Sequence, residues 1–334
     1  MTQVGIRDVA ERAGVSVGTV SNVLNGNRAV ASSTVGRVRA AIDELGYVRN
    51  DVARQLRAGR STTVGFVALD ARNPFFADIA RGAEDEASKR DLVVVVGNSD
   101  QRLDQEARYL DAFAEQRVRG ILISPLGDVS SRIEQLHVRG IPAVLVDRFS
   151  PDHRVSSVSV DDVAGGRMAV AHLLESGRRR IAFVGGPEEI RQVADRLKGA
   201  RSVVNAAGAD LEVIPAEGLT VLHGRAAGEE LAGRRPSDRP DGIFAANDLV
   251  ALGLLQSLVM RGGIRVPEDL SLIGFDDIDF AASAVVPLTS IRQPSLLMGR
   301  TALQILEAEA SPGVASPQQL VFDPELVIRR STNR

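Results

Sequence analysis

The sequence contains no cysteine and no tryptophan, and aromatic residues make up only 4% of its 334 residues. Without cysteine the chain can form no disulfide, no thiolate metal site and no cysteine nucleophile. No apolar run reaches the roughly 18 residues that a membrane-spanning helix needs, and the N-terminus shows no hydrophobic signal segment. We therefore expect a cytoplasmic protein that is neither exported nor inserted into a membrane.

Length and charge predict several domains with different partners. A chain of 334 residues is too long for one compact core and fits two or three domains. Residues 1–60 contain nine arginines and five acidic residues, whereas the rest of the chain carries 31 basic and 38 acidic residues. This basic head on an acidic body predicts that only the N-terminal part contacts phosphate groups.

The first 24 residues have the pattern of two short helices separated by a glycine turn. One face of the first helix is apolar at helical spacing: Ile6, Val9, Ala10 and Ala13. Gly14 is expected to end this helix in the left-handed conformation, and Ser16 to cap a second helix that begins at Val17. Such a pair is either a plain helical hairpin or a helix-turn-helix, whose second helix enters the DNA major groove.

The second helix is expected to bury Val20, Val23 and Leu24 and to expose Val17, Gly18, Ser21 and Asn22. A third helix, capped near Ser32 or Ser33 and stopped by Gly46, completes a small core. Four motifs resemble the LacI family of bacterial transcription regulators: Ile6-x-Asp8-Val9-Ala10, Ala13-Gly14-Val15-Ser16, Thr19-Val20-Ser21 and Leu45-Gly46-Tyr47. The resemblance implies a helix-turn-helix domain at 1–47, a hinge helix at 48–60 and an effector-binding core at 61–334.

The resemblance also implies how each part of the head meets DNA. Base readout falls on Val17, Gly18 and Asn22, and phosphate contact on Ser16, Thr19, Ser21, Asn25 and Tyr47. Pure helix capping is the alternative role for Ser16 and Thr19. Asn22 stands where the family often has arginine; because asparagine reads adenine and arginine reads guanine, we expect a different base at that half-site position.

Within residues 48–60, Asn50 or Asp51 could cap a helix of about two turns that ends near Gly59, which is too short for a helix that is stable alone. The segment is therefore either a flexible linker or, as the resemblance implies, a hinge helix that orders when two copies pair on DNA. In the second case Val52, Ala53 and Leu56 face the minor groove, with Leu56 as an apolar wedge between bases.

From residue 61 onward, short apolar runs alternate with helical stretches, which is typical of parallel sheets covered by helices. A first set of strands is expected at 63–69, 92–97, 120–124 and 142–146, and a second at 157–160, 180–184, 242–245 and 270–274. The fold class is thus a helix-turn-helix domain and hinge helix, then a two-lobed α/β core of two doubly wound parallel sheets. The resemblance extends to periplasmic sugar-binding cores.

The lobes are expected to divide near 156–162, with the chain crossing back near 287–294. On this interpretation the N-subdomain comprises 61–160 and 291–318, and the C-subdomain 161–290 and 319–330. A helix at 295–309 would pack on the first lobe, and residues 319–328 would return to the second.

Ligands of such sheets bind beyond the carboxyl ends of the strands, where this chain has several short acceptor side chains. Carboxylates facing an arginine suit the vicinal hydroxyls of a sugar, although a single aspartate after a strand can equally be a helix cap. The resemblance places the effector contacts on Phe75, Phe76, Asp147, Asp161, Arg196, Asn247 and Asp276; core packing is the alternative for the phenylalanines. Ile190, Gln192 and Leu219 stand where the purine-responsive branch is more polar or aromatic, which favours a sugar.

Enzyme chemistry has little support in the sequence. The four histidines are scattered, and neither a nucleophile elbow nor a complete phosphate loop is present. We therefore predict no catalysis, no cofactor and no metal. The sequence predicts a homodimeric repressor that binds operator DNA under control of a sugar or sugar derivative. The alternatives are a transport-type sugar-binding protein without a regulatory role and a sugar-modifying enzyme.

Overall fold

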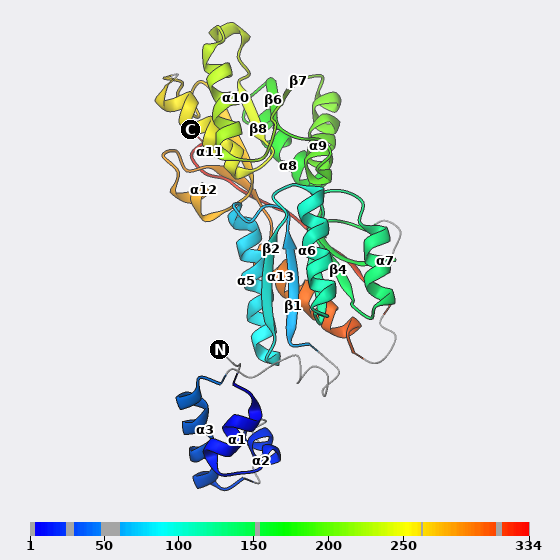
Figure 1. Cartoon of the computed structure of the whole chain (residues 1–334). Coiled ribbons are helices and arrows are strands. Elements are labelled where there is room, and N and C mark those ends of the chain that lie inside the picture. The colour runs from blue at the N-terminus through cyan, green and yellow to red at the C-terminus, as the bar shows by residue number, and fades with distance from the viewer. Residues whose placement is uncertain are drawn as a thin grey trace. The chain divides into compact units, whose positions relative to one another are not determined.

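The computed structural model describes residues 4–24, 30–47, 61–150, 154–261, 263–311 and 316–333. The chain divides into two compact units, Met1–Arg60 and Ser61–Arg334 (Figure 1). The predicted hinge helix at 48–60, with Val52, Ala53 and Leu56, lies outside the described residues, as does Asn25. No helix in the described ranges is long and apolar enough to cross a membrane.

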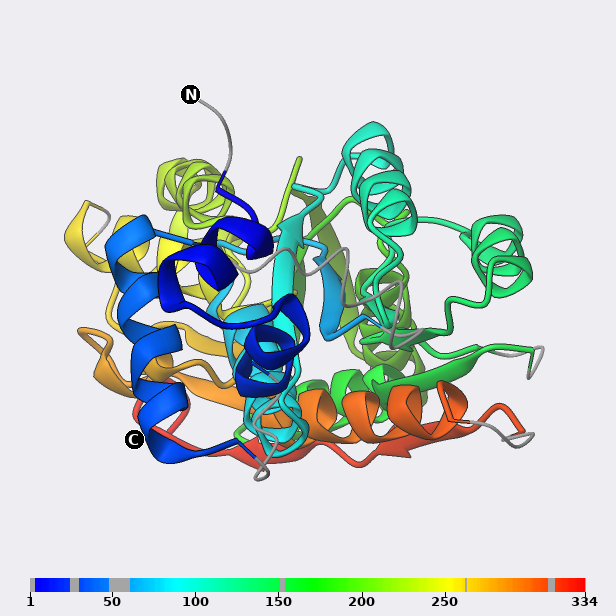
Figure 2. The same cartoon turned by 60° about the horizontal axis from the view of Figure 1, so that its bottom comes forward.

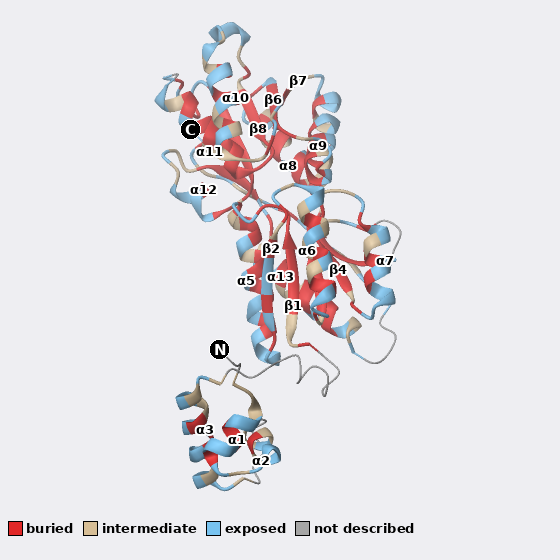
Figure 3. Cartoon of the chain, in the orientation of Figure 1, coloured by how far each residue is buried: buried red, intermediate tan, exposed pale blue. Residues whose placement is uncertain are grey.

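The first unit is a three-helix domain made of α1 (Ile6–Ala13), α2 (Val17–Leu24) and α3 (Ser32–Leu45). Its buried core consists of Val9, Ala10, Ala13, Val20, Val38 and Ala41 (Figure 3). Gly14 ends α1 with φ 65°, in the left-handed region. The Thr19 amide donates to Ser16 Oγ at 3.1 Å, so Ser16 caps α2. These features confirm the predicted helix-turn-helix.

The cap predicted for α3 is wrong. The N-cap residue is Ala31, and no side chain accepts a hydrogen bond there. Both predicted caps, Ser32 and Ser33, already lie inside the helix. The first turn of α3 is instead held by backbone hydrogen bonds, because the amides of Thr34 and Val35 donate to the Ala31 carbonyl at 2.9 and 3.1 Å.

The first lobe of the second unit is built on a six-stranded parallel sheet of order β11-β5-β4-β3-β1-β2. Its strands are β1 (Thr63–Ala68), β2 (Val93–Asn98), β3 (Gly120–Ile123), β4 (Ala143–Val146), β5 (Ser156–Val160) and β11 (Gln319–Phe322). Its helices are α5 (Pro74–Ala87), α6 (Leu103–Glu115), α7 (Ser130–Val138) and α13 (Ser295–Glu309), with η1 (Ser88–Arg90). Along β3, Leu122 packs in the core with α5 and α13, whereas Ile121 and Ile123 pack with α6 and α7. Alternate strand residues thus bury both faces of the sheet.

The second lobe has a sheet of order β12-β10-β9-β8-β6-β7, parallel except that β12 runs antiparallel to β10. Its strands are β6 (Arg180–Gly185), β7 (Asp210–Pro215), β8 (Gly242–Ala245), β9 (Ser271–Asp276), β10 (Thr289–Arg292) and β12 (Glu325–Val327). Its helices are α8 (Asp162–Glu175), α9 (Arg191–Ala207), α10 (Val221–Gly233), α11 (Asp248–Met260) and α12 (Asp279–Ser283), with η2 (Pro236–Asp238). The fold class predicted for the core is confirmed.

Two strand assignments made from the sequence are corrected. The strand predicted at 157–160 to open the second set is β5, which pairs with β4 and β11 in the first sheet. Residues 319–322 do not return to the second lobe but form β11, at the edge of the first sheet, and only β12 joins the second. The C-terminal segment, red in Figure 2, therefore contributes an edge strand to each lobe. The sheet that an edge strand joins depends on pairing with distant segments. The apolar pattern of the strand itself carries no information about that pairing.

Candidate functional site

The DNA-facing candidates of the first unit lie on the solvent side of α2. Val17 is 38% exposed, Gly18 and Asn22 are also exposed, and Val20 between them is fully buried. Ser16 Oγ and Thr19 Oγ1 form a hydrogen bond of 2.9 Å next to the cap. Tyr47 packs partly buried against the three-helix core. The surface predicted for base readout is therefore exposed and made of small residues, of which only Asn22 has a polar side chain.

In the core, the predicted effector carboxylates lie where strands end. Asp147 follows β4 directly, and Asp276 is the last residue of β9. Both have left-handed backbone conformations, with φ 58° for Asp147 and φ 105° for Asp276. Residues other than glycine rarely adopt such conformations. Such strain persists only where the surrounding structure holds it, and it concentrates at functional sites.

Arg196 is the centre of a buried polar cluster. Its Nε donates to Asp162 Oδ1 at 2.8 Å, and its Nη1 donates to the Ala246 carbonyl at 2.7 Å. The same Nη1 lies 3.8 Å from Asp276 Oδ1. The guanidinium also stacks on the ring of Phe275, 3.6 Å from its centroid. Because Arg196 is only 4% exposed, these contacts fix its position firmly.

Two hydrogen-bonded contacts join the lobes at this cluster. Asp276 Oδ2 accepts from Asn73 Nδ2 of the first lobe at 2.8 Å, and Oδ1 accepts from Gln293 Nε2 at 2.8 Å. Gln192 of α9 donates through Nε2 to Asp147 Oδ2 at 2.8 Å and to the Asp147 carbonyl. Asp147 and Asp276, which the sequence nominated for effector contact, thus each take part in a contact between the lobes.

The cluster contains three acidic side chains, those of Asp147, Asp162 and Asp276, but only one basic side chain, that of Arg196. Burial raises the pKa of Asp147 well above its usual value, and the charge of Asp162 raises it further. Burial also raises the pKa of Asp162, to about 6, although Arg196 acts in the opposite direction. The pKa of Asp276 is raised by burial as well, against the lowering effect of Arg196. Three buried carboxylates share one guanidinium, so protons or ligand donor groups would stabilise the cluster.

Other predicted effector residues have partners within the protein. Asn247 caps α11 by accepting from the Val250 amide at 2.9 Å, and its Nδ2 donates to the Leu219 carbonyl. Asp161 caps α8 by accepting from the Ala164 amide at 2.7 Å. For both, the helix-cap role that the sequence left open is present.

The two phenylalanines are core residues in this structure. Phe75 is 2% exposed and Phe76 is 5% exposed. Their rings pack edge to face with centroids 5.1 Å apart. In this structure Phe75 and Phe76 therefore have the core-packing role that the sequence left as the alternative to ligand contact.

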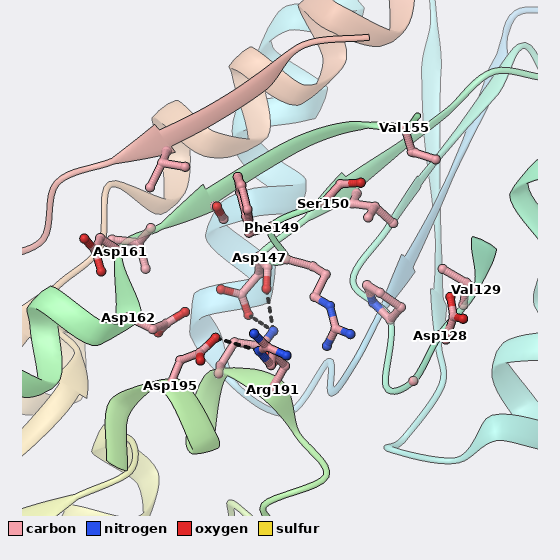
Figure 4. A pocket seen from close by; sticks show the side chains of 18 of the residues that line it. Asp128, Val129, Asp147, Phe149, Ser150, Val155, Asp161, Asp162, Arg191 and Asp195 are labelled. Atoms are coloured by element: carbon pink, nitrogen blue, oxygen red, sulfur yellow. Dashed lines mark hydrogen bonds and ion pairs between the residues drawn. The ribbon is translucent and has the colours of Figure 1, made fainter. Parts of the chain in front are cut away.

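A cavity of about 590 Å³ opens beside the Arg196 cluster. Its lining includes Asp147 and Asp161 but not Arg196, Asn247, Asp276, Phe75 or Phe76. The Arg196 and Asp276 side chains instead make hydrogen bonds within the protein. Figure 4 shows Asp147 at the end of its strand, facing Arg191 and Asp195 of α9 across the cavity.

Sequence reasoning missed several residues of the site. Asp162 bonds Arg196 directly, and Asn73 and Gln293 hold Asp276. Asp162 stands next to the nominated Asp161, so the paired aspartates after β5 were an available signal. Asn73 and Gln293 gave no comparable signal, because each reaches Asp276 only through folding of distant segments.

The fold and the cleft define a class of protein, in which a helix-turn-helix domain precedes a two-lobed α/β ligand-binding core. Residues 5–50 match the family described as bacterial regulatory proteins, lacI family, and residues 170–332 match the periplasmic binding protein-like domain. The HTH-type transcriptional repressor PurR of Photobacterium profundum is 34% identical over 332 residues, covering 98% of each chain. The ribose operon repressor of Bacillus subtilis (strain 168) is 36% identical over 301 residues, covering 90% of each.

Solved structures agree. The transcriptional regulator CelR–cellobiose complex is 35% identical with a TM-score of 0.73, covering 98% of this chain and 99% of that one. The lac repressor dimer bound to operator and the anti-inducer ONPF is 27% identical with a TM-score of 0.83, covering 99% of each. The chain belongs to the lacI family of bacterial regulatory proteins.

Proposed function

We propose that this protein is a transcriptional repressor whose affinity for operator DNA is controlled by a sugar or sugar derivative bound between the lobes of its core. The observation that carries the proposal is the Arg196 cluster, in which three carboxylates and a guanidinium meet at the lobe junction. Relatives named as repressors and a CelR structure with bound cellobiose support it. The protein acts by binding rather than catalysis, in the cytoplasm where the operator lies.

In this proposal α2 reads the operator. Val17, Gly18 and Asn22 face the bases, while Ser16, Thr19, Ser21, Asn25 and Tyr47 contact phosphates, and Val52, Ala53 and Leu56 of the hinge enter the minor groove. The exposure of Val17, Gly18 and Asn22 on α2 supports this arrangement. Two copies bind one near-palindromic site, as a dimer of the related lac repressor does with its operator.

Effector binding would change operator affinity through the contacts that join the lobes. A ligand whose hydroxyls bind Asp276 or Asp147 competes with Asn73 and Gln192 for the same carboxylate oxygens. Its differential affinity for the two lobe arrangements sets the coupling, typically about 1 to 3 kcal/mol. Asp161, Asn247, Phe75 and Phe76 complete the proposed effector wall once their present contacts rearrange.

The test is a fluorescence-anisotropy titration of labelled DNA from upstream of the protein's own gene, with and without ribose and cellobiose, at two salt concentrations. We expect saturable binding that survives competitor DNA and shifts with a sugar. Equal binding to unrelated DNA that vanishes at modest salt would reject sequence-specific recognition, because only non-specific electrostatics would remain.

A further inference from the structure

The C-terminal tail, Arg329–Thr332, docks into the second lobe beside the first residues of β9 and β10. The Leu272 amide donates to the Ser331 carbonyl at 3.0 Å, and the Ser331 amide donates to the Pro287 carbonyl at 2.9 Å. Ser331 Oγ accepts from the Thr289 amide at 2.8 Å, and Ser331 is fully buried. Hydrogen bonds to two different segments therefore fix the tail in one position.

Arg329 connects this fixed tail to Asp277. Its Nη1 donates to Asp277 Oδ1, and also to the Leu288 carbonyl at 2.8 Å. Arg292 Nε donates to the other oxygen, Asp277 Oδ2, at 2.8 Å, but Arg292 also pairs with the exposed Glu325. The Arg329 side chain is 18% exposed and that of Arg292 is 44% exposed. Because water and salt weaken exposed ion pairs, the contact with Arg329 holds Asp277 more firmly.

Asp277 in turn fixes the backbone turn that presents Asp276. The two aspartates are consecutive at the end of β9, with φ 105° at Asp276 and φ 55° at Asp277. Residues other than glycine rarely adopt these conformations, which persist only while their surroundings hold them. The Asp277 amide donates to Ser290 Oγ at 3.1 Å, so Asp277 is held at its backbone and at both carboxylate oxygens. Loss of the Arg329 contact would let the turn relax and move Asp276.

Asp276 is the residue at which movement of this turn would act. Its Oδ2 accepts from Asn73 Nδ2 of the first lobe at 2.8 Å, and its Oδ1 lies 3.8 Å from Arg196 Nη1. Hydrogen bonds weaken steeply with distance and misalignment, so a small shift of the carboxylate would break the contact with Asn73. Two neighbouring carboxylates, those of Asp277 and Asp276, thus connect the C-terminal tail to the lobe junction.

We propose that Arg329 is a positioning residue for effector control: by holding Asp277, it aims the Asp276 carboxylate at the lobe junction, where Asn73 and the effector compete for it. This inference rests on the proposed function, in which Asp276 binds the effector. Arg329 acts only through Asp277 and does not touch the effector itself. The C-terminal tail therefore contributes to effector affinity as well as to the stability of the second lobe.

The first experiment compares Arg329→Gln with Arg330→Gln in the full-length chain. Arg330 is the next residue and is exposed, so its variant removes the same charge without releasing Asp277. Hydrogen exchange followed by mass spectrometry measures the local opening of residues 274–280. We expect this segment to exchange at least about tenfold faster in Arg329→Gln, the scale of one lost hydrogen bond to a charged group. Arg330→Gln should exchange at the wild-type rate.

Isothermal titration with cellobiose and with D-ribose measures the consequence for the effector. Arg329→Gln should bind whichever sugar binds the wild type at least about tenfold more weakly, whereas Arg330→Gln should bind it normally. Arg329→Lys keeps a cation but loses the planar fork, so its affinity should lie between those of Arg329→Gln and the wild type. Since Arg329 acts through Asp277, adding Asp277→Asn to Arg329→Gln should weaken binding little further.

Ser331→Ala separates positioning from stability. It removes the buried Oγ that bonds the Thr289 amide and the Leu272 carbonyl, but it leaves the Arg329 side chain in place. We expect a lower urea midpoint of unfolding, with sugar affinity and exchange of residues 274–280 close to those of the wild type. Equal losses of affinity in Ser331→Ala and Arg329→Gln, at equal midpoints, would show that the tail only stabilises the lobe and would overturn the inference.

The remaining outcomes separate this inference from the function beneath it. Wild-type exchange and wild-type affinity in a folded Arg329→Gln variant overturn the positioning role but leave a sugar-controlled repressor intact. If Arg329→Gln does not fold, Arg329→Lys carries the same comparison. A wild type that binds neither sugar counts against the proposed effector, and exchange of residues 274–280 then decides the positioning role by itself: faster exchange in Arg329→Gln supports it, and unchanged exchange rejects it.

Discussion

Asp147 and Asp276 each combine a strained backbone with a buried carboxylate, at φ 58° and φ 105°. Asp248 stabilises the turn after β9, because its carboxylate accepts hydrogen bonds from the Ile278 amide at 2.9 Å and from Ser290 Oγ at 2.7 Å. Ser290 Oγ in turn accepts from the Asp277 amide at 3.1 Å. The conformation that aims Asp276 at the cluster is thus stabilised by a second buried carboxylate rather than by Asp276 itself.

Asp162 predicts a pH dependence of stability. Burial raises its pKa to about 6 in the folded chain, above its ordinary value of about 4 when unfolded. The folded state therefore binds more protons between about pH 4 and 6, and this contribution to the free energy of unfolding falls as pH rises through that window. The slope from one such group is at most about 1.4 kcal/mol per pH unit.

Urea unfolding of the wild type and Asp162→Asn at several pH values between 4.5 and 7.5, roughly the window set by that pKa, measures the effect. His172, whose pKa burial lowers, acts in the opposite direction in both proteins. The difference between the two proteins therefore reports Asp162 together with its effect on the pKa of Asp147. We expect the wild type to gain stability relative to the variant on acidification. Parallel pH profiles would contradict the prediction.

Asn22 is the residue on which operator preference should depend most. It is exposed on α2, and an asparagine that bonds adenine bidentately contributes about 1 to 3 kcal/mol of discrimination. Asn22→Ala should weaken operator binding by about 5- to 150-fold and leave binding to random DNA unchanged, whereas Asn22→Arg should favour guanine at one half-site position. Selection from a randomised operator library checks this; an unaltered base preference would remove Asn22 from the reading surface.

At the scale of elements, paired helices meet through glycines. A Cβ on Gly199 of α9 would lie 2.2 Å from the Val163 carbonyl, and one on Gly166 of α8 would lie 2.1 Å from the Arg196 carbonyl. The α5–α13 pair has the same reciprocal contact through Gly82 and Gly299. Close approach of α8 and α9 therefore positions Asp162 against Arg196.

Gly199→Ala should force α8 and α9 apart. Because the nearest atom is backbone and cannot swing away, we expect the free energy of unfolding to fall by about 1 to 3 kcal/mol. Sugar affinity should fall with it, since Asp162 and Arg196 lie on the two helices. Arg201→Ala, at an exposed position of the same helix, is the control and should change neither denaturation midpoint nor affinity. Wild-type stability in Gly199→Ala would show that the helices can separate without cost.

At the scale of the whole molecule, a homodimer needs an apolar surface. The edge strand β2 exposes three valines: Val93 by 59%, Val95 by 43% and Val96 by 43%. An exposed apolar edge strand is a pairing surface unless a partner covers it. We therefore expect a second copy to cover β2.

Val95→Lys should shift the protein from dimer to monomer in sedimentation velocity, because a charge would be buried in the interface. Operator affinity should fall as well, since one protomer reads only one half-site. Val138→Lys is the control, at an 84% exposed position at the end of α7. A fully dimeric Val95→Lys variant would move the interface elsewhere.

The sequence by itself determined the local features of this protein. Gly14 and Gly46 end helices in the left-handed conformation, Ser16 caps α2, and apolar periodicity marks the helix-turn-helix and most core strands. Family motifs then pointed to Asp147, Arg196 and Asp276, which the fold brings to one cluster. All these signals act within a few residues, so they are readable in one dimension.

Only the tertiary structure decided the rest. It placed β5 and β11 in the first sheet, paired Asp162 with Arg196, and set Asn73 against Asp276, 203 positions along the chain. It also left Asp147, Gln192 and Ser159 each with a buried side-chain atom that has no hydrogen-bond partner. Such contacts depend on which distant segments pack together, and no local propensity or spacing encodes that choice.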